Sequence, residues 1–291
     1  MTKKIVSLLC MFLFLATEIS TVQAEELRLG VVASRGALKA KAKWTPFATY
    51  LGSKTNTTVR LIPLTPDKVS AAVAGNSIDF MLGNPVITTI LVEKHGVKPV
   101  ATIKKKSGSQ FAGVIIANKT KGISNSADLK GKKVMAFKFG SSAAAYVFQV
   151  YHMKKNGIDP FKDFSVFKEA KKQDDIVLAV KSGIFDAGFI KSGLLEAMGK
   201  EGKIKINDFV IVDKKSDSLK DVHSTILYPQ WYLVAGSKVS SSQFKKVKQA
   251  VLSLKASDPA AKKAKIKGFV KPLNLADMKA TLKALHLPPY K

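Results

Sequence analysis

Cysteine is almost absent from this chain of 291 residues. The single cysteine, Cys10, lies within an apolar N-terminal segment that we expect to be removed from the mature protein. The mature chain would then have neither disulfide bonds nor thiol chemistry. Apolar cores must therefore stabilise it, and a chain of this length suits two lobes or domains.

Residues 1–24 show the three parts of a secretory signal peptide. Lys3 and Lys4 precede an apolar run at 5–16, and the sequence Val-Gln-Ala at 22–24 resembles a cleavage site. The apolar run is shorter than the roughly 20 residues that span a membrane, and no later stretch reaches that length. We expect a soluble mature protein that begins near Glu25 and lies outside the cytoplasm.

Arginine is scarce although the chain is strongly basic. The net charge is +27, yet the only arginines are Arg28, Arg35 and Arg60. Nucleic-acid recognition relies on arginine and on stacked aromatic rings, so we expect no nucleic-acid partner. Lysines spread along the chain favour a soluble protein with a general attraction for anions. A basic protein that binds a surface or a nucleic acid is the alternative.

The common catalytic motifs are also missing. The sequence contains no Gly-x-Ser-x-Gly elbow, no phosphate-binding loop and no His-x-x-x-His metal pair. Asp79 and Asp186 fall in turns before strands, where aspartate is common, so they do not indicate an acid–base pair. We therefore predict a protein that is not an enzyme and uses neither a metal nor a cofactor. The four histidines are scattered: His95, His152, His223 and His286.

Two segments of the chain read as copies of one unit. In each copy an extended segment (59–64 and 164–170) leads into a short amphipathic helix, a turn and an apolar strand. In open α/β sheets ligands bind beyond the carboxyl ends of the strands. One such unit in each half predicts an α/β protein with two similar lobes facing a cleft. The identical pairs keep one separation: Asp67/Asp174, Ala72/Ala179, Val73/Val180 and Asp79/Asp186.

The rest of the pattern predicts the order of the lobes. Apolar segments at 111–117 and 226–234 are long enough to cross between them. We therefore predict a first lobe formed by 25–115 and 226–291, a second lobe formed by 116–225, and hinge closure around a ligand. Further strands are predicted at 27–32, 100–104, 134–137 and 210–212, and helices at 39–51, 85–95, 142–155, 241–254 and 275–285, with another from Pro259.

Candidate ligand contacts follow the predicted strand ends of the first lobe. Arg35 follows the first strand, and its planar guanidinium suits an oxyanion. Asn84 precedes the helix at Pro85, so its amide could face a ligand. An ordinary surface arginine and a simple helix cap are the alternatives.

The second lobe offers two further strand ends. Gly140 permits a tight turn before Ser141 and Ser142, where the free N–H groups of a helix start favour an anion. Lys191 and Ser192 occupy the place that Asn84 holds in the first lobe. A serine N-cap and a solvated lysine are the alternatives.

His223 lies just before the returning strand and could donate to a bound anion, although an ordinary loop histidine fits equally well. Tyr228 is a further candidate contact. The predicted pocket wall comprises Trp44, Phe111, Gln173 and Trp231.

Taken in order, these motifs resemble the phosphate/phosphite/phosphonate (PhnD-like) family of periplasmic substrate-binding proteins. The resemblance also extends to the periplasmic sensor domain of tetrathionate-sensing histidine kinases. It covers nearly the whole mature chain. The matching segments are 29–31 with 35–36, 44–46, 73–85, 111–115, 128–134, 157–161, 173–174, 186–196, 223–225 with 227–229, and 287–290.

The resemblance implies a type II periplasmic binding fold and carries ligand contacts over to Arg35, Asn84, Ser141-Ser142, Lys191-Ser192 and His223. Two departures stand out. The chain has Lys172-Gln173-Asp174 where phosphonate binders carry a Ser-His pair, and Lys191 where the sensor kinases tend to have arginine. The first departure puts phosphonate itself in doubt, and the second replaces a planar fork with a point charge. A small phosphorus or sulfur oxyanion remains as the implied ligand.

The implied partner is a membrane protein. As an ABC-importer binding protein, the chain would deliver its ligand to a permease. As a stand-alone periplasmic sensor, it would present the ligand to a two-component histidine kinase. We expect transport, because no kinase domain or tether follows Tyr290-Lys291 and transport is the commoner use of such proteins. We also expect a monomer.

Overall fold

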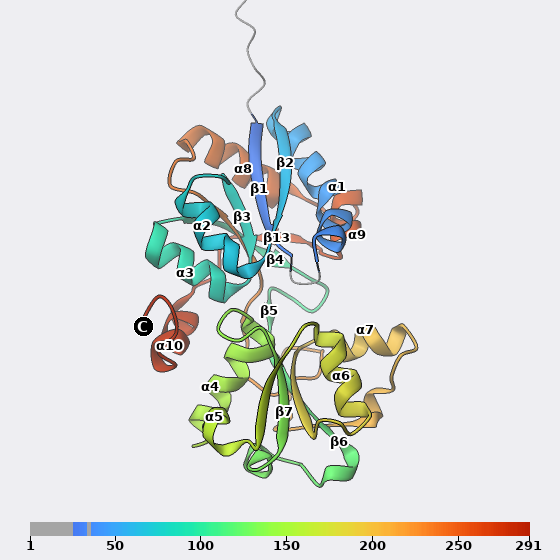
Figure 1. Ribbon diagram of the computed structural model, residues 1–291. Coiled ribbons are helices and arrows are strands. Elements are labelled where there is room, and N and C mark those ends of the chain that lie inside the picture. Colours follow the sequence, from blue (N-terminus) through green and yellow to red (C-terminus); the bar gives the residue numbers. More distant parts are fainter. Residues whose placement is uncertain (1–25, 34–35) are drawn as a thin grey trace, which may run out of the picture.

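The computed structural model describes residues 26–33 and 36–291, arranged as two lobes one above the other (Figure 1). The predicted signal segment and Arg35 lie outside the described residues. Within the described ranges, no helix is long and apolar enough to cross a membrane.

The first lobe is built on a six-stranded sheet in the order β13-β4-β12-β3-β1-β2. β1, β2 and β3 are parallel, whereas β12 runs antiparallel to both β3 and β4. β3 and β4 therefore point the same way, and both end at the edge that faces the second lobe (Figure 1). The strands are β1 (Glu26–Val32), β2 (Thr58–Leu64), β3 (Phe80–Gly83), β4 (Lys98–Lys104), β12 (Tyr232–Ala235) and β13 (Gly268–Val270).

Side chains of a strand alternate between the two faces of the sheet, and here both faces are apolar. A layer of helices therefore covers each face. Phe80 and Leu82 pack in one apolar cluster with α1, α8 and α9, whereas Met81 packs in another with α2 and α3. The helices are α1 (Ala37–Thr55), α2 (Val69–Ala74), α3 (Pro85–His95), α8 (Ser241–Ser253) and α9 (Pro259–Ala264).

The second lobe has a five-stranded sheet in the order β10-β6-β9-β7-β8. Its strands are β6 (Gly113–Asn118), β7 (Lys133–Phe137), β8 (Val166–Ala170), β9 (Ala187–Lys191) and β10 (Phe209–Ile211). Its helices are α4 (Phe148–Lys155), α5 (Pro160–Asp163), α6 (Gln173–Lys181) and α7 (Leu194–Lys200).

The predicted repeat is confirmed by the pairing of the strands. β12-β3-β1-β2 in the first sheet corresponds to β6-β9-β7-β8 in the second, with the same parallel and antiparallel neighbours. The two repeated aspartates make equivalent hydrogen bonds in the two sheets. Asp79 Oδ2 accepts the backbone N–H of Arg28 (2.7 Å), and Asp186 Oδ2 accepts that of Lys133 (2.9 Å). Each carboxylate thus bonds the backbone near the start of the parallel neighbouring strand, β1 for Asp79 and β7 for Asp186.

Two segments cross between the lobes and pair with each other. β5 (Gln110–Phe111) and β11 (Tyr228–Pro229) form a two-stranded antiparallel sheet at the crossing. The two predicted long strands are therefore broken. The first is interrupted at Ala112, because the N–H and C=O of that residue both bond Ser192 of the second lobe. The second is interrupted between β11 and β12.

The predicted helix at 142–155 is only partly helical. Ala143–Val147 forms a π-type turn, and the regular helix begins at Phe148. Ala144 and Ala145 have non-helical backbone angles. Gln149 Nε2 bonds the carbonyls of Ala144 (2.9 Å), Val114 (3.2 Å) and Ile190 (2.8 Å), and so stabilises the unwound turn against β6 and β9.

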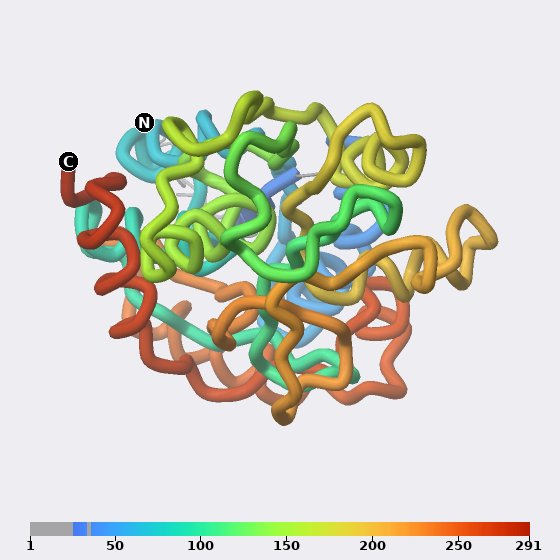
Figure 2. Tube along the Cα trace, turned by 90° about the horizontal axis from the view of Figure 1, so that it is seen from below, coloured from blue at the N-terminus to red at the C-terminus, as the bar shows by residue number. Residues whose placement is uncertain are grey.

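The C-terminal helix α10 (Ala276–Ala284) lies against both lobes along one side of the molecule (Figures 1 and 2). Its Lys279 pairs with Glu93 of α3 in the first lobe at 2.7 Å. Its Ala284 carbonyl accepts a hydrogen bond from Lys154 of α4 in the second lobe. α10 was predicted at 275–285, but β13, α5 and α7 were not predicted.

Candidate functional site

The strand ends of the two lobes meet directly. Asn84 Oδ1 accepts the N–H of Ile87 at 3.0 Å, so the predicted cap of α3 is confirmed. Asn84 Nδ2 donates to the carbonyl of Ser141 in the second lobe at 3.1 Å. The Asn84 amide therefore both begins a helix and ties the two lobes together.

A tight turn places Lys105 at the same edge. Lys105 follows β4 directly, and its N–H donates to the Gly108 carbonyl (2.8 Å) while the Gly108 N–H donates back (3.1 Å). Gly108 has a φ of 106°, which side-chain-bearing residues rarely adopt. The turn therefore fixes the position of Lys105 at the end of its strand.

Lysines from both lobes gather around Lys105. Burial holds the pKa of Lys105 well below its usual value, and the positive charges of Lys191 and Lys43 lower it further, while Asp221 opposes them. Lys43 lies in α1 of the first lobe and Lys191 ends β9 of the second. All three lysines are half-buried, Lys105 directly follows β4, and Lys191 lies beside Ser192, whose Oγ bonds the crossing segment. We call Lys43, Lys105 and Lys191 the lysine cluster.

Lys191 is held in place by its backbone. Its N–H donates to Gln173 Oε1 at 3.1 Å, which joins the end of β9 to the start of α6. Ser192, the next residue, is buried, and its Oγ accepts the N–H of Ala112 at 3.2 Å. The structure thus brings together Lys191, a predicted ligand contact, and Gln173, a predicted wall residue, and Ser192 binds the crossing segment.

The serines before the unwound turn lie at the lobe contact. The N–H groups of Ser141 and Ser142 both donate to the Lys138 carbonyl, at 3.3 and 3.0 Å. Neither side chain caps the π-type turn, and Ser142 is buried. Their predicted role as ligand donors therefore rests on position alone.

His223 is buried inside a loop that supports the crossing strand. Its Nε2 pairs with Asp217 Oδ2 at 3.0 Å and its Nδ1 bonds the Asp221 carbonyl at 3.0 Å. The next residue, Ser224, accepts the Ile115 N–H through its Oγ at 2.9 Å. Both ring nitrogens of His223 are therefore engaged within the protein, and only 1% of the residue is exposed.

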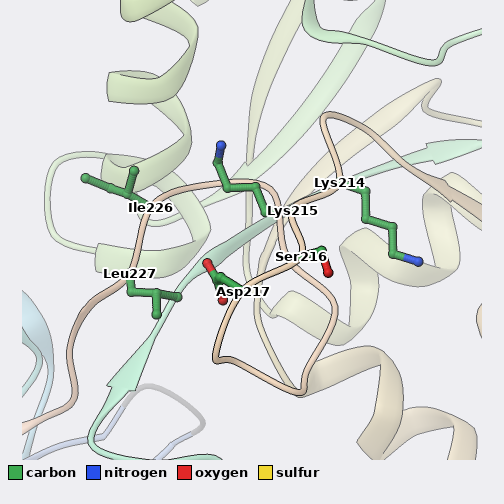
Figure 3. Close-up of a pocket in the computed structure, with 6 residues that line it drawn as sticks. All are labelled: Lys214, Lys215, Ser216, Asp217, Ile226 and Leu227. Carbon is green, nitrogen blue, oxygen red and sulfur yellow. The ribbon is translucent and has the colours of Figure 1, made fainter.

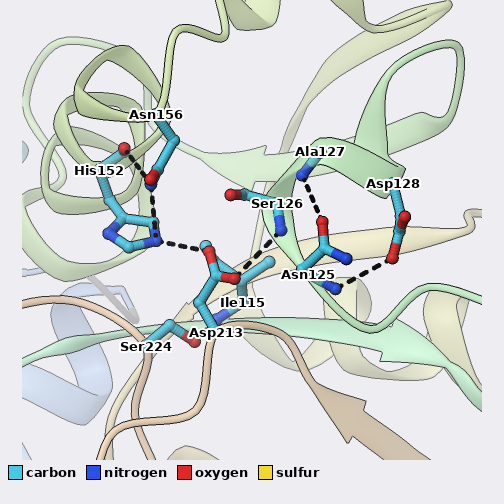
Figure 4. Close-up of polar contacts among 9 residues, drawn as sticks. All are labelled: Ile115, Asn125, Ser126, Ala127, Asp128, His152, Asn156, Asp213 and Ser224. Carbon is cyan, nitrogen blue, oxygen red and sulfur yellow. Dashed lines mark hydrogen bonds and ion pairs between the residues drawn. The ribbon is translucent and has the colours of Figure 1, made fainter.

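A second histidine–aspartate pair holds the start of the same loop (Figure 4). His152 Nε2 of α4 lies 2.7 Å from Asp213 Oδ2, and Asp213 Oδ1 accepts the Ser126 N–H at 3.1 Å. The loop 213–223, which contains Asp221, is therefore held at its start by the His152–Asp213 pair and at its end by the contacts of His223.

The predicted aromatic wall is divided among apolar cores. Tyr228 is fully buried, stacks on Phe148 with ring centroids 3.9 Å apart, and bonds Thr281 Oγ1 at 2.9 Å. Phe111 packs edge-on against the same Phe148 ring. Trp44 is buried in α1 beneath Lys43 Nζ, which lies 4.8 Å from its ring centroid. Trp231 is half-buried and packs against the cores on both faces of the first sheet.

Two surface pockets lie outside the predicted contacts. One, of about 540 Å³, is formed by Lys214, Lys215, Ser216, Asp217, Ile226 and Leu227 (Figure 3). The other, of about 450 Å³, lies between α4, α5 and the C-terminal segment. The first pocket contains Asp217, whose carboxylate already pairs with His223. Within the described residues, no group of three or more His, Cys, Asp or Glu could hold a metal.

Lys105, Lys43 and Asp221 were not predicted from the sequence. Lys105 directly follows a predicted strand, which is the criterion that selected Asn84 and Lys191. It lies, however, within a run of three lysines in a lysine-rich chain, so its residue type carried no signal. Lys43 lies in a helix rather than at a strand end.

Comparisons with known proteins agree on fold and family. A family model described as the periplasmic substrate-binding protein of a phosphonate ABC transporter matches residues 29–276. No curated protein sequence gives a match.

Three solved structures share the architecture at low sequence identity. PhnD1 of Prochlorococcus marinus, in complex with methylphosphonate, is 15% identical with a TM-score of 0.74, and the match covers 90% of this chain and 98% of that one. A binding component of an ABC phosphonate transporter from Pseudomonas aeruginosa is 17% identical (TM-score 0.72; 89% and 85% covered). A Xanthomonas citri protein bound to ATP is 15% identical (TM-score 0.75; 90% and 98% covered). These neighbours confirm the predicted two-lobed type II fold.

Proposed function

The chain belongs to the family of periplasmic substrate-binding proteins of phosphonate ABC transporters, and we propose that its lysine cluster captures a small phosphorus or sulfur oxyanion. Solute binding is the function of this family. The oxyanion would lie between a first lobe of 25–115 with 226–291 and a second lobe of 116–225. The two lobes would close around it at the paired crossing segments β5 and β11.

One observation carries this proposal. Asn84 Nδ2 at the end of β3 donates to the Ser141 carbonyl of the other lobe, Lys105 follows β4 and Lys191 ends β9, so donors and cations from both lobes stand at facing strand ends. In keeping with this placement, the charges of Lys191 and Lys43 lower the pKa of Lys105. Three ammonium groups held together repel one another, and Asp221 supplies one opposing charge. An anion between them would replace that repulsion with attraction and would favour the closed arrangement of the lobes.

The residue types indicate a compact, highly charged ligand. Lysine is a point charge with three rotatable donors, whereas arginine offers a planar fork for bidentate recognition. A cluster of lysines therefore selects for charge and size more than for planar geometry. Two structural neighbours were determined with methylphosphonate and with ATP, both of which carry phosphorus oxyanions, and this supports the proposed ligand class.

A thermal-shift panel tests the ligand class. The protein is heated with phosphate, phosphite, methylphosphonate, sulfate, thiosulfate or tetrathionate, and with amino acids, sugars and divalent metals as controls. A ligand at about 100 times its dissociation constant adds roughly 2.7 kcal/mol to the free energy of unfolding. The proposal expects at least one oxyanion to reach this effect. A shift with only amino acids, sugars or metals would contradict it.

The proposed partner is the permease of an ABC importer, with the protein acting as a monomer. Presentation of the ligand to a histidine kinase is the alternative. A pull-down of membrane proteins with the ligand-loaded protein as bait separates the two. Recovery of an importer permease supports transport, and recovery of a two-component kinase without a permease contradicts it.

A further inference from the structure

The helical layer on one face of the first-lobe sheet has an extreme charge composition. Helices α1, α8 and α9 pack side by side against the sheet. They contain nine lysines and no aspartate or glutamate. Of the other helices of at least eight residues, α3, α6 and α10 each contain at least one carboxylate, whereas α4 has none but carries only two lysines. We call α1, α8 and α9 the basic layer.

Most of these lysines project into solvent. Lys43 belongs to the lysine cluster and Lys248 is half-buried. The loops that follow α8 and α9 add exposed lysines at 255, 265 and 267 and one acidic residue, Asp258, whose carboxylate accepts the Lys255 N–H at 2.8 Å. The exposed lysines of the helices themselves are Lys39, Lys41, Lys54, Lys245, Lys246, Lys262 and Lys263.

The residues between the lysines do not suit a protein or nucleic-acid partner. Stable protein interfaces concentrate Trp, Tyr and Arg at buried centres. Nucleic-acid surfaces add stacking aromatic rings. The three helices contain no arginine, and their aromatic residues are buried or half-buried. Among the described residues, Leu38 is the only large hydrophobic side chain of this layer that is exposed.

We propose that the basic layer docks the protein onto the anionic phospholipid surface of the membrane that bounds the periplasm. Flexible lysines without a fixed binding geometry suit a diffuse negative surface, to which each nearby lysine adds a modest attraction. Such docking is weak, reversible and sensitive to salt. It would keep a membrane transporter's binding protein close to the bilayer, and it does not depend on which solute occupies the cleft.

Vesicle sedimentation tests the docking. The full mature protein is mixed with vesicles of phosphatidylcholine alone, or with about a third phosphatidylglycerol, near physiological salt. The test variant carries Lys41→Glu, Lys246→Glu and Lys263→Glu, one change in each helix of the basic layer. The control variant carries Lys130→Glu, Lys168→Glu and Lys200→Glu, which are exposed on the second lobe and change the net charge equally.

We expect the wild type and the control variant to bind anionic vesicles but not neutral ones. The test variant should lose at least about tenfold in partition coefficient. Equal losses in the two variants would show diffuse attraction to net charge and would overturn the proposal. Absence of vesicle binding together with retention on immobilised poly-glutamate would also overturn it, in favour of an acidic protein partner. Both variants should keep the thermal shifts produced by oxyanions. This control distinguishes a loss of membrane docking from a loss of oxyanion binding between the lobes.

Discussion

At the scale of single residues, Lys105 predicts that anion binding depends on pH. Its lowered pKa means that part of the apo protein carries a neutral amine between that pKa and 10.5. A bound anion favours the charged form, so binding takes up a proton in this window and the affinity falls as pH rises. Calorimetric titrations from about pH 6 to about pH 10 should show a decline of up to tenfold per pH unit.

The variant Lys105→Arg provides the matched control, because a guanidinium stays protonated over this range. Its affinity should lose most of the pH dependence. The apo wild type should also gain stability as pH rises through the same window, since the unfolded chain there binds the proton that the folded chain has released. Identical pH profiles for the wild type and Lys105→Arg would exclude Lys105 as the titrating group.

Asp186 supplies a prediction about acid stability. Burial acts to raise its pKa, but the Lys133 N–H bond and the nearby Lys121 ammonium prevail and keep it below its usual value. The ionised Asp186 carboxylate therefore stabilises the fold fully above the pKa that Asp186 has in the unfolded chain. This stabilisation is lost as pH falls through the lower pKa of the folded state. Asp186→Ala should cost about 1–2 kcal/mol of unfolding free energy near neutral pH, and much less near pH 3. Denaturant titration measures both, and exposed Asp175→Ala should be nearly neutral.

At the scale of elements, the unwound turn before α4 depends on one buried amide. Gln149 is fully buried, and its Nε2 bonds carbonyls of three different segments. Gln149→Leu keeps a similar volume but leaves those carbonyls without this donor, so we expect a loss of about 2–4 kcal/mol in unfolding free energy. The same change at exposed Gln110 should cost little. Equal costs at both positions would show that the turn does not rely on the Gln149 amide.

The same turn shows what sequence patterns could not reveal. Alanine is the best helix former, so Ala143 to Ala145 favoured a continuous helix. Long-range bonds from Gln149 to β6 and β9 override that local preference, and no local pattern signals them. By contrast, the helix at Pro85 was predicted correctly because its cap and first-turn proline are adjacent in sequence.

At the scale of the whole molecule, the repeat predicted the architecture well. Asp79 and Asp186 mark equivalent positions in two sheets of matching strand order, and their correspondence in the sequence is enough to predict two lobes. The candidate site was predicted less completely. Strand-end reasoning selected Asn84 and Lys191, whose ligand roles stay predictions, whereas Lys43 lies in a helix and Lys105 within a run of lysines, so neither carried a signal. Arg35 lies outside the described residues and stays a prediction.

The central claim is that an oxyanion binds at the lysine cluster between the lobes. Isothermal titration of wild type, Lys191→Ala and Lys262→Ala with the most stabilising oxyanion tests it most directly. A hydrogen bond to a charged group contributes about 1.5–3 kcal/mol, so Lys191→Ala should weaken binding tenfold or more. Lys262→Ala, on the exposed face of α9, should bind like the wild type. Equal losses from the two substitutions would mean that the anion is attracted by the overall charge of the protein, and would contradict the account.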